Sequence, residues 1–132
     1  LCWHKPAAMG RSPVGWCNWE PVLLWGRPVT KHTDYICAPI RTDLRLNHQC
    51  PKPISLLRQL IERYSRSGDV VCDPFMGSGT TAVACKQLGR NYIGFEIDPE
   101  TAALARERVR LTPEPLLLPD EPEPQLALEI LG

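Results

Sequence analysis

The chain has 132 residues, the size of one domain at most. Hydrophobic residues make up 43% of it, and no apolar run approaches the roughly 18 residues that a membrane span needs. The net charge of zero conceals an asymmetry: residues 1–111 carry all 15 Lys and Arg, whereas residues 112–132 carry five acidic residues and no basic one. The excess of basic residues in residues 1–111 is compatible with a polyanionic partner such as nucleic acid but does not require one.

No pattern in the sequence indicates a membrane, an oxidising compartment or a metal. The N-terminus lacks the basic stretch followed by an apolar stretch that marks a secretory signal peptide. The six cysteines include no CxxC pair, so we expect reduced, buried thiols and no metal site. These features predict a cytoplasmic location.

The N-terminal part of the chain, residues 1–53, is rich in Trp, Pro and Gly and has weak periodicity. Within it, the run EPVLLWG at residues 20–26 predicts one short buried strand. Residues 27–50 hold polar and basic positions without a clear period, and we expect a loop or an irregular insert there.

The second half of the chain alternates between helical and strand patterns. Apolar residues recur at helical spacing over 54–64, and further helices are predicted over 80–88 and 98–110. The β-branched run at 70–72 predicts a buried parallel strand, and 92–96 predicts a second strand. The order helix, strand, helix, strand, helix with short connections predicts an α/β domain with parallel strands.

A glycine turn between the first of these strands and the next helix carries the strongest signal. Residues 77–82, GSGTTA, match the pattern GxGxx followed by Gly or Ala, whose glycines let the backbone turn tightly and approach a ligand. The helix that follows directs its first amides at the same place. Glu96 and Asp98 lie 19 and 21 residues after Gly77, the spacing at which an acidic side chain meets ribose hydroxyls. The unit therefore predicts a nucleotide-type cofactor.

Asp73 narrows the class of cofactor. No Lys follows Gly79 as it does in a Walker A loop, which disfavours ATP or GTP hydrolysis. At the carboxyl end of a strand, a carboxylate would repel a pyrophosphate and attract the ammonium and sulfonium charges of S-adenosylmethionine. The alternative is that Asp73 only forms the turn before Pro74. We expect S-adenosylmethionine as the cofactor.

Three segments resemble motifs of the DNA N6-adenine/N4-cytosine methyltransferase family. Residues 73–81, DPFMGSGTT, look like its DPFxGSGTT cofactor motif, and residues 89–98, GRNYIGFEID, resemble the segment that holds its ribose-binding acid. Residues 48–53, HQCPKP, are similar to its HPxxKP motif, in which the Lys-Pro turn and the next helix hold the methionine end of the cofactor. Gln49 departs from the usual Pro of that motif.

The resemblance implies a set of cofactor-binding residues. Asp73 and Phe75 would face the cofactor, the two glycines would make the close turn, and Glu96 would bind the ribose. Two residues have alternative roles: Asp98 as the N-cap of the next helix, and Lys52 as a solvated surface charge. The full set is Lys52, Pro53, Asp73, Pro74, Phe75, Gly77, Ser78, Gly79, Thr80, Glu96 and Asp98.

The catalytic motif of that family is missing. There, an Asp, Asn or Ser followed by two prolines and an aromatic residue polarises the target amine and stacks on a flipped-out base. Residues 12–16, SPVGW, come nearest and lack the second proline, so we assign no catalytic residue. The motif is expected upstream of Leu1, in a longer protein of which this chain, without an initiator Met, would be a fragment.

The resemblance implies the C-terminal, cofactor-binding part of an S-adenosylmethionine-dependent DNA methyltransferase acting on adenine N6 or cytosine N4. Its partner would be double-stranded DNA, and its source a bacterial restriction–modification system or a phage. Two alternatives stay open: a methyltransferase acting on RNA or a small molecule, and a truncated relic that binds without turnover.

The resemblance over residues 1–111 and the composition of the remainder together predict three regions. Residues 1–47 would hold a partial strand and a target-recognition-like irregular region, residues 48–111 the cofactor-binding α/β region, and residues 112–132 a flexible, acidic, proline-rich tail. The fold would be part of a Rossmann-like doubly wound methyltransferase sheet with an open strand edge. The isolated chain would then be marginally stable, or would need an N-terminal half or a complementing subunit.

Overall fold

The computed structural model describes residues 1–5, 10–12, 15–17, 19–39 and 52–114. The expected acidic tail from residue 115 onward and the first four residues of the HPxxKP-like string lie outside this part. The elements are β1 (Cys2–His4), β2 (Gly10–Ser12), β3 (Gly15–Cys17), β4 (Trp19–Pro21), β5 (Tyr35–Cys37), α1 (Ile54–Tyr64), β6 (Val70–Asp73), α2 (Thr80–Gln87), β7 (Asn91–Gly94) and α3 (Pro99–Leu111).

The N-terminal strands form a small mixed sheet with the order β4-β1-β5, in which β1 pairs antiparallel with β4 and parallel with β5. Trp3 of β1 and Ile36 of β5 are 3% and 0% exposed, and they pack with Ala38 and with Leu56 of α1. The apolar side of α1 thus joins the N-terminal sheet to the rest of the chain. A separate hairpin pairs β2 with β3.

Two expectations for the N-terminal part are wrong. Residues 20–26 do not form one buried strand: β4 ends at Pro21, and Leu23 and Trp25 are 94% and 103% exposed. Pairing decides this boundary, because the register brings Pro21 opposite Cys2, where β1 begins. The stretch 27–50 is not entirely irregular either, since it contains β5, a strand too short to show a period.

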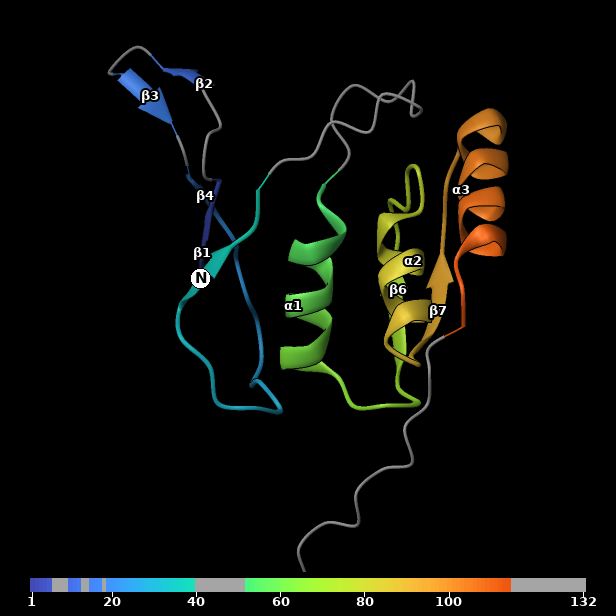
Figure 1. The fold of residues 1–132 in the computed structure, drawn as a ribbon, viewed down its shortest axis with the longest axis horizontal. Helices are drawn as coiled ribbons and strands as arrows, with labels where there is room; N and C mark the ends of the chain where they lie inside the picture. The colour runs from blue at the N-terminus through green and yellow to red at the C-terminus, as the bar shows by residue number, and fades with distance from the viewer. Residues whose placement is uncertain (6–9, 13–14, 18, 40–51, 115–132) are drawn as a thin grey trace, which may run out of the picture.

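The second half of the chain has the expected order of elements. Helix α1, strand β6, helix α2, strand β7 and helix α3 follow one another (Figure 1). Strands β6 and β7 are parallel, with Asp73 opposite Gly94. The predicted α/β arrangement with parallel strands is confirmed. Strand β7 ends at Gly94, two residues before the predicted end, and α3 continues one residue further, to Leu111.

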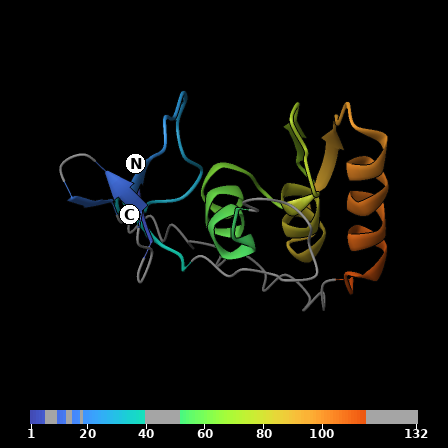
Figure 2. The ribbon, with the colours of Figure 1, turned by 90° about the horizontal axis from the view of Figure 1, so that it is seen from above.

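The helices α1 and α2 lie in a row on one side of β6 and β7 (Figure 2). Buried Ile61, Ala84 and Cys85 form the core between the two helices, and Val71 of β6 packs against it. Strand side chains alternate between faces, so Val70 points to the other face, where it is 59% exposed. The expectation of a fully buried strand at 70–72 is therefore wrong, because the described residues cover only one face of it.

The described cysteines differ in part from the expected burial. Cys85 is buried, but Cys37 and Cys72 are exposed, so the expected burial of the thiols is wrong for these two. The four cysteines whose side chains are described are free thiols. None of the helices in the described ranges has the length and apolar character of a membrane span.

Candidate functional site

The carboxyl ends of β6 and β7 bring two acidic residues to one edge of the sheet. Strand β6 ends at Asp73, and Glu96 follows two residues after the end of β7. The backbone links the two ends, since the amide of Met76 donates to the carbonyl of Phe95 at 2.8 Å and the amide of Phe95 donates to the carbonyl of Asp73 at 3.0 Å. The turn between β6 and α2 therefore lies beside both acids.

The carboxylate of Asp73 is oriented by both ends of this turn. Its Oδ1 accepts a hydrogen bond from the Phe75 amide at 3.0 Å, and its Oδ2 accepts one from the Thr81 hydroxyl at 2.6 Å. The first bond is that of a turn-forming residue, in line with the alternative considered for Asp73. Each carboxylate oxygen has a further lone pair, so the group can still accept from a ligand. Thr81 was not among the expected site residues, although it lies in the first turn of the helix that follows the glycines.

The carboxylate of Glu96 holds the other side of the turn. Its Oε2 accepts from the amide of Gly77 at 2.8 Å, and its Oε1 accepts from the amide of Asp98 at 3.0 Å. The spacing of 19 residues between Gly77 and Glu96 thus corresponds to a direct contact. A carboxylate fixed by two backbone amides presents its remaining lone pairs in a constant direction.

The turn itself requires glycine at two positions. Gly77 and Gly79 have φ values of 53° and 83°, a region that residues with a Cβ rarely adopt. A Cβ added at Gly79 would also lie 2.9 Å from the Cβ of Ala105, so α3 packs directly on the turn. The pattern GxGxx followed by Ala therefore serves both a tight turn and close packing.

Ser78 and Thr80 are buried parts of the same turn, with exposures of 4% and 7%. The guanidinium of Arg108 on α3 donates to the carbonyl of Ser78 and, at 2.9 Å, to its hydroxyl. Arg108 was missed at the level of sequence, because 30 residues separate it from Ser78 and no local pattern connects them.

Two grooves flank this arrangement. One, of about 690 Å³, runs between β7 and α3 and is lined by residues that include Phe75, Tyr92, Phe95 and Glu96. Phe75 is 88% exposed, and Pro74 beside it is also exposed. The other groove, of about 620 Å³, runs between α1 and β6, with Asp73 at one end. An aromatic side chain free to stack and a carboxylate therefore open onto hollows of a size suited to a nucleoside-containing ligand.

The upstream residues Lys52 and Pro53 lie at the start of α1. Pro53 is buried and occupies the N-cap position of the helix. The Lys52 ammonium lies 2.9 Å from Oε2 of Glu20, and the side chain is 54% exposed, so in this structure Lys52 is both solvated and an ion-pair partner. Glu20 and its contacts were not anticipated from the sequence, because 32 residues separate the pair.

Asp98 has the capping role that was one of its two alternatives. Its Oδ2 accepts from the amide of Thr101 at 2.8 Å and from the Thr101 hydroxyl, and Pro99 follows it at the first helical position. The hydrogen bonds from Thr101 hold the pKa of the Asp98 carboxyl below its usual value. Within the described ranges, no three His, Cys, Asp or Glu side chains are grouped so as to hold a metal ion.

The site residues expected from the sequence lie within a segment that matches a known protein family. The sequence profile of the DNA methylase family N6_N4_Mtase matches residues 19–107, which include Lys52, Asp73, Glu96 and the glycine turn. The chain belongs to this N6/N4 DNA methylase family.

Curated relatives in this family are type II methyltransferases of bacteria. The chain is 46% identical to M.HinfI of Haemophilus influenzae over 69 residues, which is 52% of this chain and 19% of that protein. It is 34% identical to M.BglI of Bacillus subtilis over 98 residues, which is 74% of this chain and 25% of that protein. The chain thus spans only about a fifth to a quarter of the length of these relatives.

Solved DNA methyltransferases share the α/β fold. The crystal structure of the M1.HpyAVI–SAM complex matches with a TM-score of 0.63 and 28% identity, covering 82% of this chain and 59% of that one. The cytosine-N4-specific PvuII DNA methyltransferase matches with a TM-score of 0.61 and 20% identity, covering 82% of this chain and 49% of that one, which shows the fold alone.

Proposed function

We propose that this chain is the S-adenosylmethionine-binding, C-terminal part of a DNA methyltransferase that acts on the exocyclic amine of adenine (N6) or cytosine (N4). One observation carries the proposal: Asp73 and Glu96 lie on either side of a glycine turn at the carboxyl ends of two adjacent parallel strands. Ligands bind at this edge in open α/β sheets. The similarity to M1.HpyAVI, whose structure was solved with SAM, supports the choice of cofactor.

Each proposed contact has a physical basis. Asp73 would attract the positive charge of the methionine ammonium, in a site where Oδ1 and Oδ2 are already aimed by the turn and α2. Glu96 would accept from the ribose hydroxyls, and exposed Phe75 with Pro74 would cover the adenine. The backbone of the glycine turn would approach the cofactor closely at Gly77, Ser78, Gly79 and Thr80. One wall of the cofactor site would be formed by Lys52 and Pro53, at the start of α1. Asp98 would contribute to the cofactor site indirectly, by capping α3.

The chemistry would be a direct methyl transfer. When bound, S-adenosylmethionine would supply the methyl group of its sulfonium, and its sulfur would become a neutral thioether. The target amine, held by the rest of the protein, would receive this methyl group and release a proton to the solvent. The chain's own part would be to hold the donor, since its sequence lacks the family motif of two prolines and an aromatic residue that polarises the amine.

The same proposal covers the missing parts of the fold and the partner. We propose that β6 and β7 belong to a larger Rossmann-like, doubly wound sheet completed by an N-terminal half or a complementing subunit. The completed protein would bind double-stranded DNA in the cytoplasm of a bacterium. The gene for the chain would lie in the bacterial genome or in the genome of a phage. The bacterial origin of the curated relatives supports this location.

The donor site is tested by calorimetry with S-adenosylmethionine. We expect Asp73→Ala and Glu96→Ala each to weaken binding at least tenfold, because each removes a charge-assisted contact of about 1.5–3 kcal/mol. Glu62→Ala is the matched control, since Glu62 is an acidic residue in an exposed ion pair with Arg58 on α1. Unchanged affinity in both site variants would overturn the assignment.

A second candidate is a chain that binds the donor without turning it over. The absence of the Pro-Pro-aromatic motif favours it for this chain alone. A methyl-transfer assay separates the two: the proposed enzyme part gains activity on DNA when an upstream half carrying that motif is supplied, whereas a relic does not. RNA and small amines as substrates in the same assay test the remaining alternative.

A further inference from the structure

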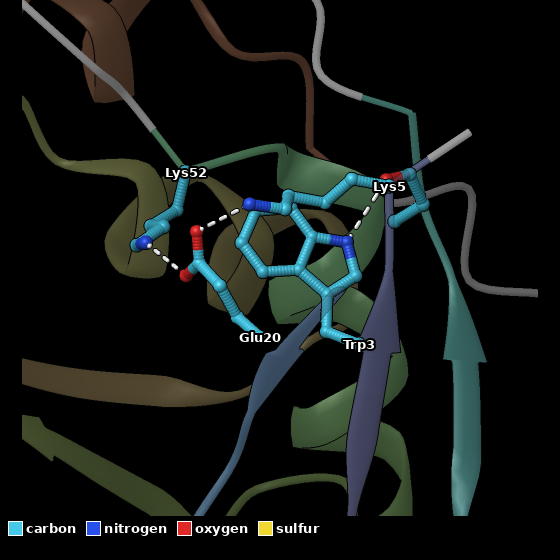
Figure 3. A network of polar contacts seen from close by, with 5 residues as sticks. Trp3, Lys5, Glu20 and Lys52 are labelled. Carbon is cyan, nitrogen blue, oxygen red and sulfur yellow. Dashed lines mark hydrogen bonds and ion pairs between the residues drawn. The ribbon is translucent and has the colours of Figure 1, made fainter. Parts of the chain in front are cut away.

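Glu20 of β4 joins two lysines from different parts of the chain (Figure 3). Its Oε1 lies 2.8 Å from the ammonium of Lys5, and its Oε2 lies 2.9 Å from that of Lys52. Both ammonium groups also lie over the ring of Trp3, at 5.7 Å and 5.1 Å from its centroid. Each carboxylate oxygen of Glu20 therefore has its own cation, and one aromatic ring underlies both.

The base of this arrangement is rigid. Trp3 is 3% exposed, and its indole N–H donates to the carbonyl of Ala38 at 2.9 Å, which fixes the ring across the sheet from β1 to the residue after β5 (Figure 3). Lys5 is 8% exposed, so its charge requires a partner. An isolated surface ion pair contributes little, but here Lys52 joins a network whose other members are already held in place.

The start of α1 is the segment that the network holds. Lys52 directly precedes Pro53, the N-cap of α1, which is buried. Leu57 and Leu60 of the same helix line the groove that also contains Asp73 and Thr81. A shift at the start of α1 would therefore change the width of this groove beside the Asp73 carboxylate.

We propose that Glu20 is a positioning residue of the methyl-donor site: it holds Lys52 against Trp3 and so fixes the wall that α1 forms opposite Asp73. This inference rests on the proposed function. Lys52 then acts as a strut between the N-terminal sheet and α1, not as a ligand of the donor's carboxylate. The carboxylate of Glu20 thus adds a polar link between the N-terminal sheet and the start of α1, beside the apolar packing of Leu56 on Trp3 and Ile36.

A double-mutant cycle on the 132-residue chain tests the coupling, with the dissociation constant of S-adenosylmethionine measured by calorimetry. We expect Glu20→Gln and Lys52→Gln each to raise this constant roughly tenfold, which is within the range of coupling between groups in direct contact. The double variant should bind no more weakly than either single variant, because both remove the same pair. Additive losses would show that Lys52 contacts the donor by itself, and would overturn the inference.

The control variant is Glu62→Gln, which removes an acidic partner from α1 itself: the Arg58–Glu62 pair is exposed and its atoms are 3.8 Å apart. Its affinity should stay within about twofold of the wild type, since exposed pairs contribute little. Thermal unfolding of all variants gives the second readout. A lower unfolding temperature with unchanged affinity would mean that the pair only stabilises the fold, and would overturn the inference.

The outcomes separate this inference from the proposed function. A wild-type chain that binds no S-adenosylmethionine overturns both. A wild-type chain that binds, with affinity lost in Asp73→Ala but unchanged in Glu20→Gln and Lys52→Gln, overturns the positioning role alone. If Glu20→Gln does not fold because buried Lys5 loses its counter-charge, Lys52→Gln decides, since the Lys52 side chain is 54% exposed and can be replaced without a buried charge.

Discussion

Gly79 shows how closely α3 approaches the glycine turn. Its φ of +83° strains any other residue, and a Cβ there would lie 2.9 Å from the Cβ of Ala105. We expect Gly79→Ala to lower the free energy of unfolding by roughly 2–5 kcal/mol, the sum of about 1–2 for left-handed strain and about 1–3 for overpacking. Gly68→Ala separates the two terms, because Gly68 has a φ of +82° and open space around it. Urea unfolding measures both, and equal losses would contradict the packing argument.

The ion pairs of Glu20 should make the free energy of unfolding depend on pH. The hydrogen bond from Lys5, followed by that from Lys52, holds the pKa of the Glu20 carboxyl below its usual 4.5. A lowered pKa means that this stabilisation is complete above pH 4.5 and is lost as the pH falls through the lowered value. The free energy of unfolding should therefore fall less steeply between pH 5 and 3 in Glu20→Gln than in the wild type. Parallel curves would contradict the contribution of Glu20.

At the scale of elements, the cap of α3 can be separated from cofactor binding. We expect Asp98→Ala to lower the unfolding temperature by about 4 °C, because it removes the acceptor for the amide of Thr101, whereas Asp98→Asn keeps an acceptor and loses most of this effect. Neither change should weaken the binding of S-adenosylmethionine beyond about twofold if Asp98 acts through the cap alone. A tenfold loss of affinity in Asp98→Asn would instead make Asp98 a cofactor contact.

The elements also show where sequence patterns succeed. The helix over Ile54–Tyr64 was predicted to the residue, and the strand order β6, β7 with its glycine turn follows from spacing alone. Short strands were harder: β5 has three residues and no period, and the end of β4 depends on where β1 begins. The error at residues 20–26 has the same cause, since an apolar run indicates burial only if some segment is available to cover it.

At the scale of the whole molecule, the sheet of β6 and β7 has one uncovered face in the described part of the chain. Val70 and Ile93 are 59% and 52% exposed on it, and exposed Cys72 lies directly opposite Ile93 in the strand register. Exposed apolar strands of this kind are paired or covered in stable domains. The isolated chain is therefore predicted to be marginally stable, and an N-terminal half of the family fold should raise its unfolding temperature.

Labelling of thiols tests whether the exposed face of β6 and β7 is covered by a complementing half. Iodoacetamide at neutral pH should modify Cys72 in the isolated chain and more slowly once a complementing half is added. Cys85 is the internal control: burial raises the pKa of its thiol to about 11, so it should react in neither case until the chain unfolds. A sharp two-state transition of the isolated monomer near about 60 °C, with Cys72 equally reactive in both samples, would contradict the need for a complement.

The sequence by itself determined the features that depend on residues close together along the chain. The glycine turn, the N-cap at Asp98, the order of helices and strands and the position of Asp73 at a strand end all follow from residues a few places apart. The tertiary structure alone decided the contacts that cross long separations. Arg108 reaches Ser78 over 30 residues, and Glu20 reaches Lys52 over 32. These two contacts depend on which surfaces pack together. Because hydrophobic packing is non-directional, no local sequence pattern indicates which residues it will bring into contact.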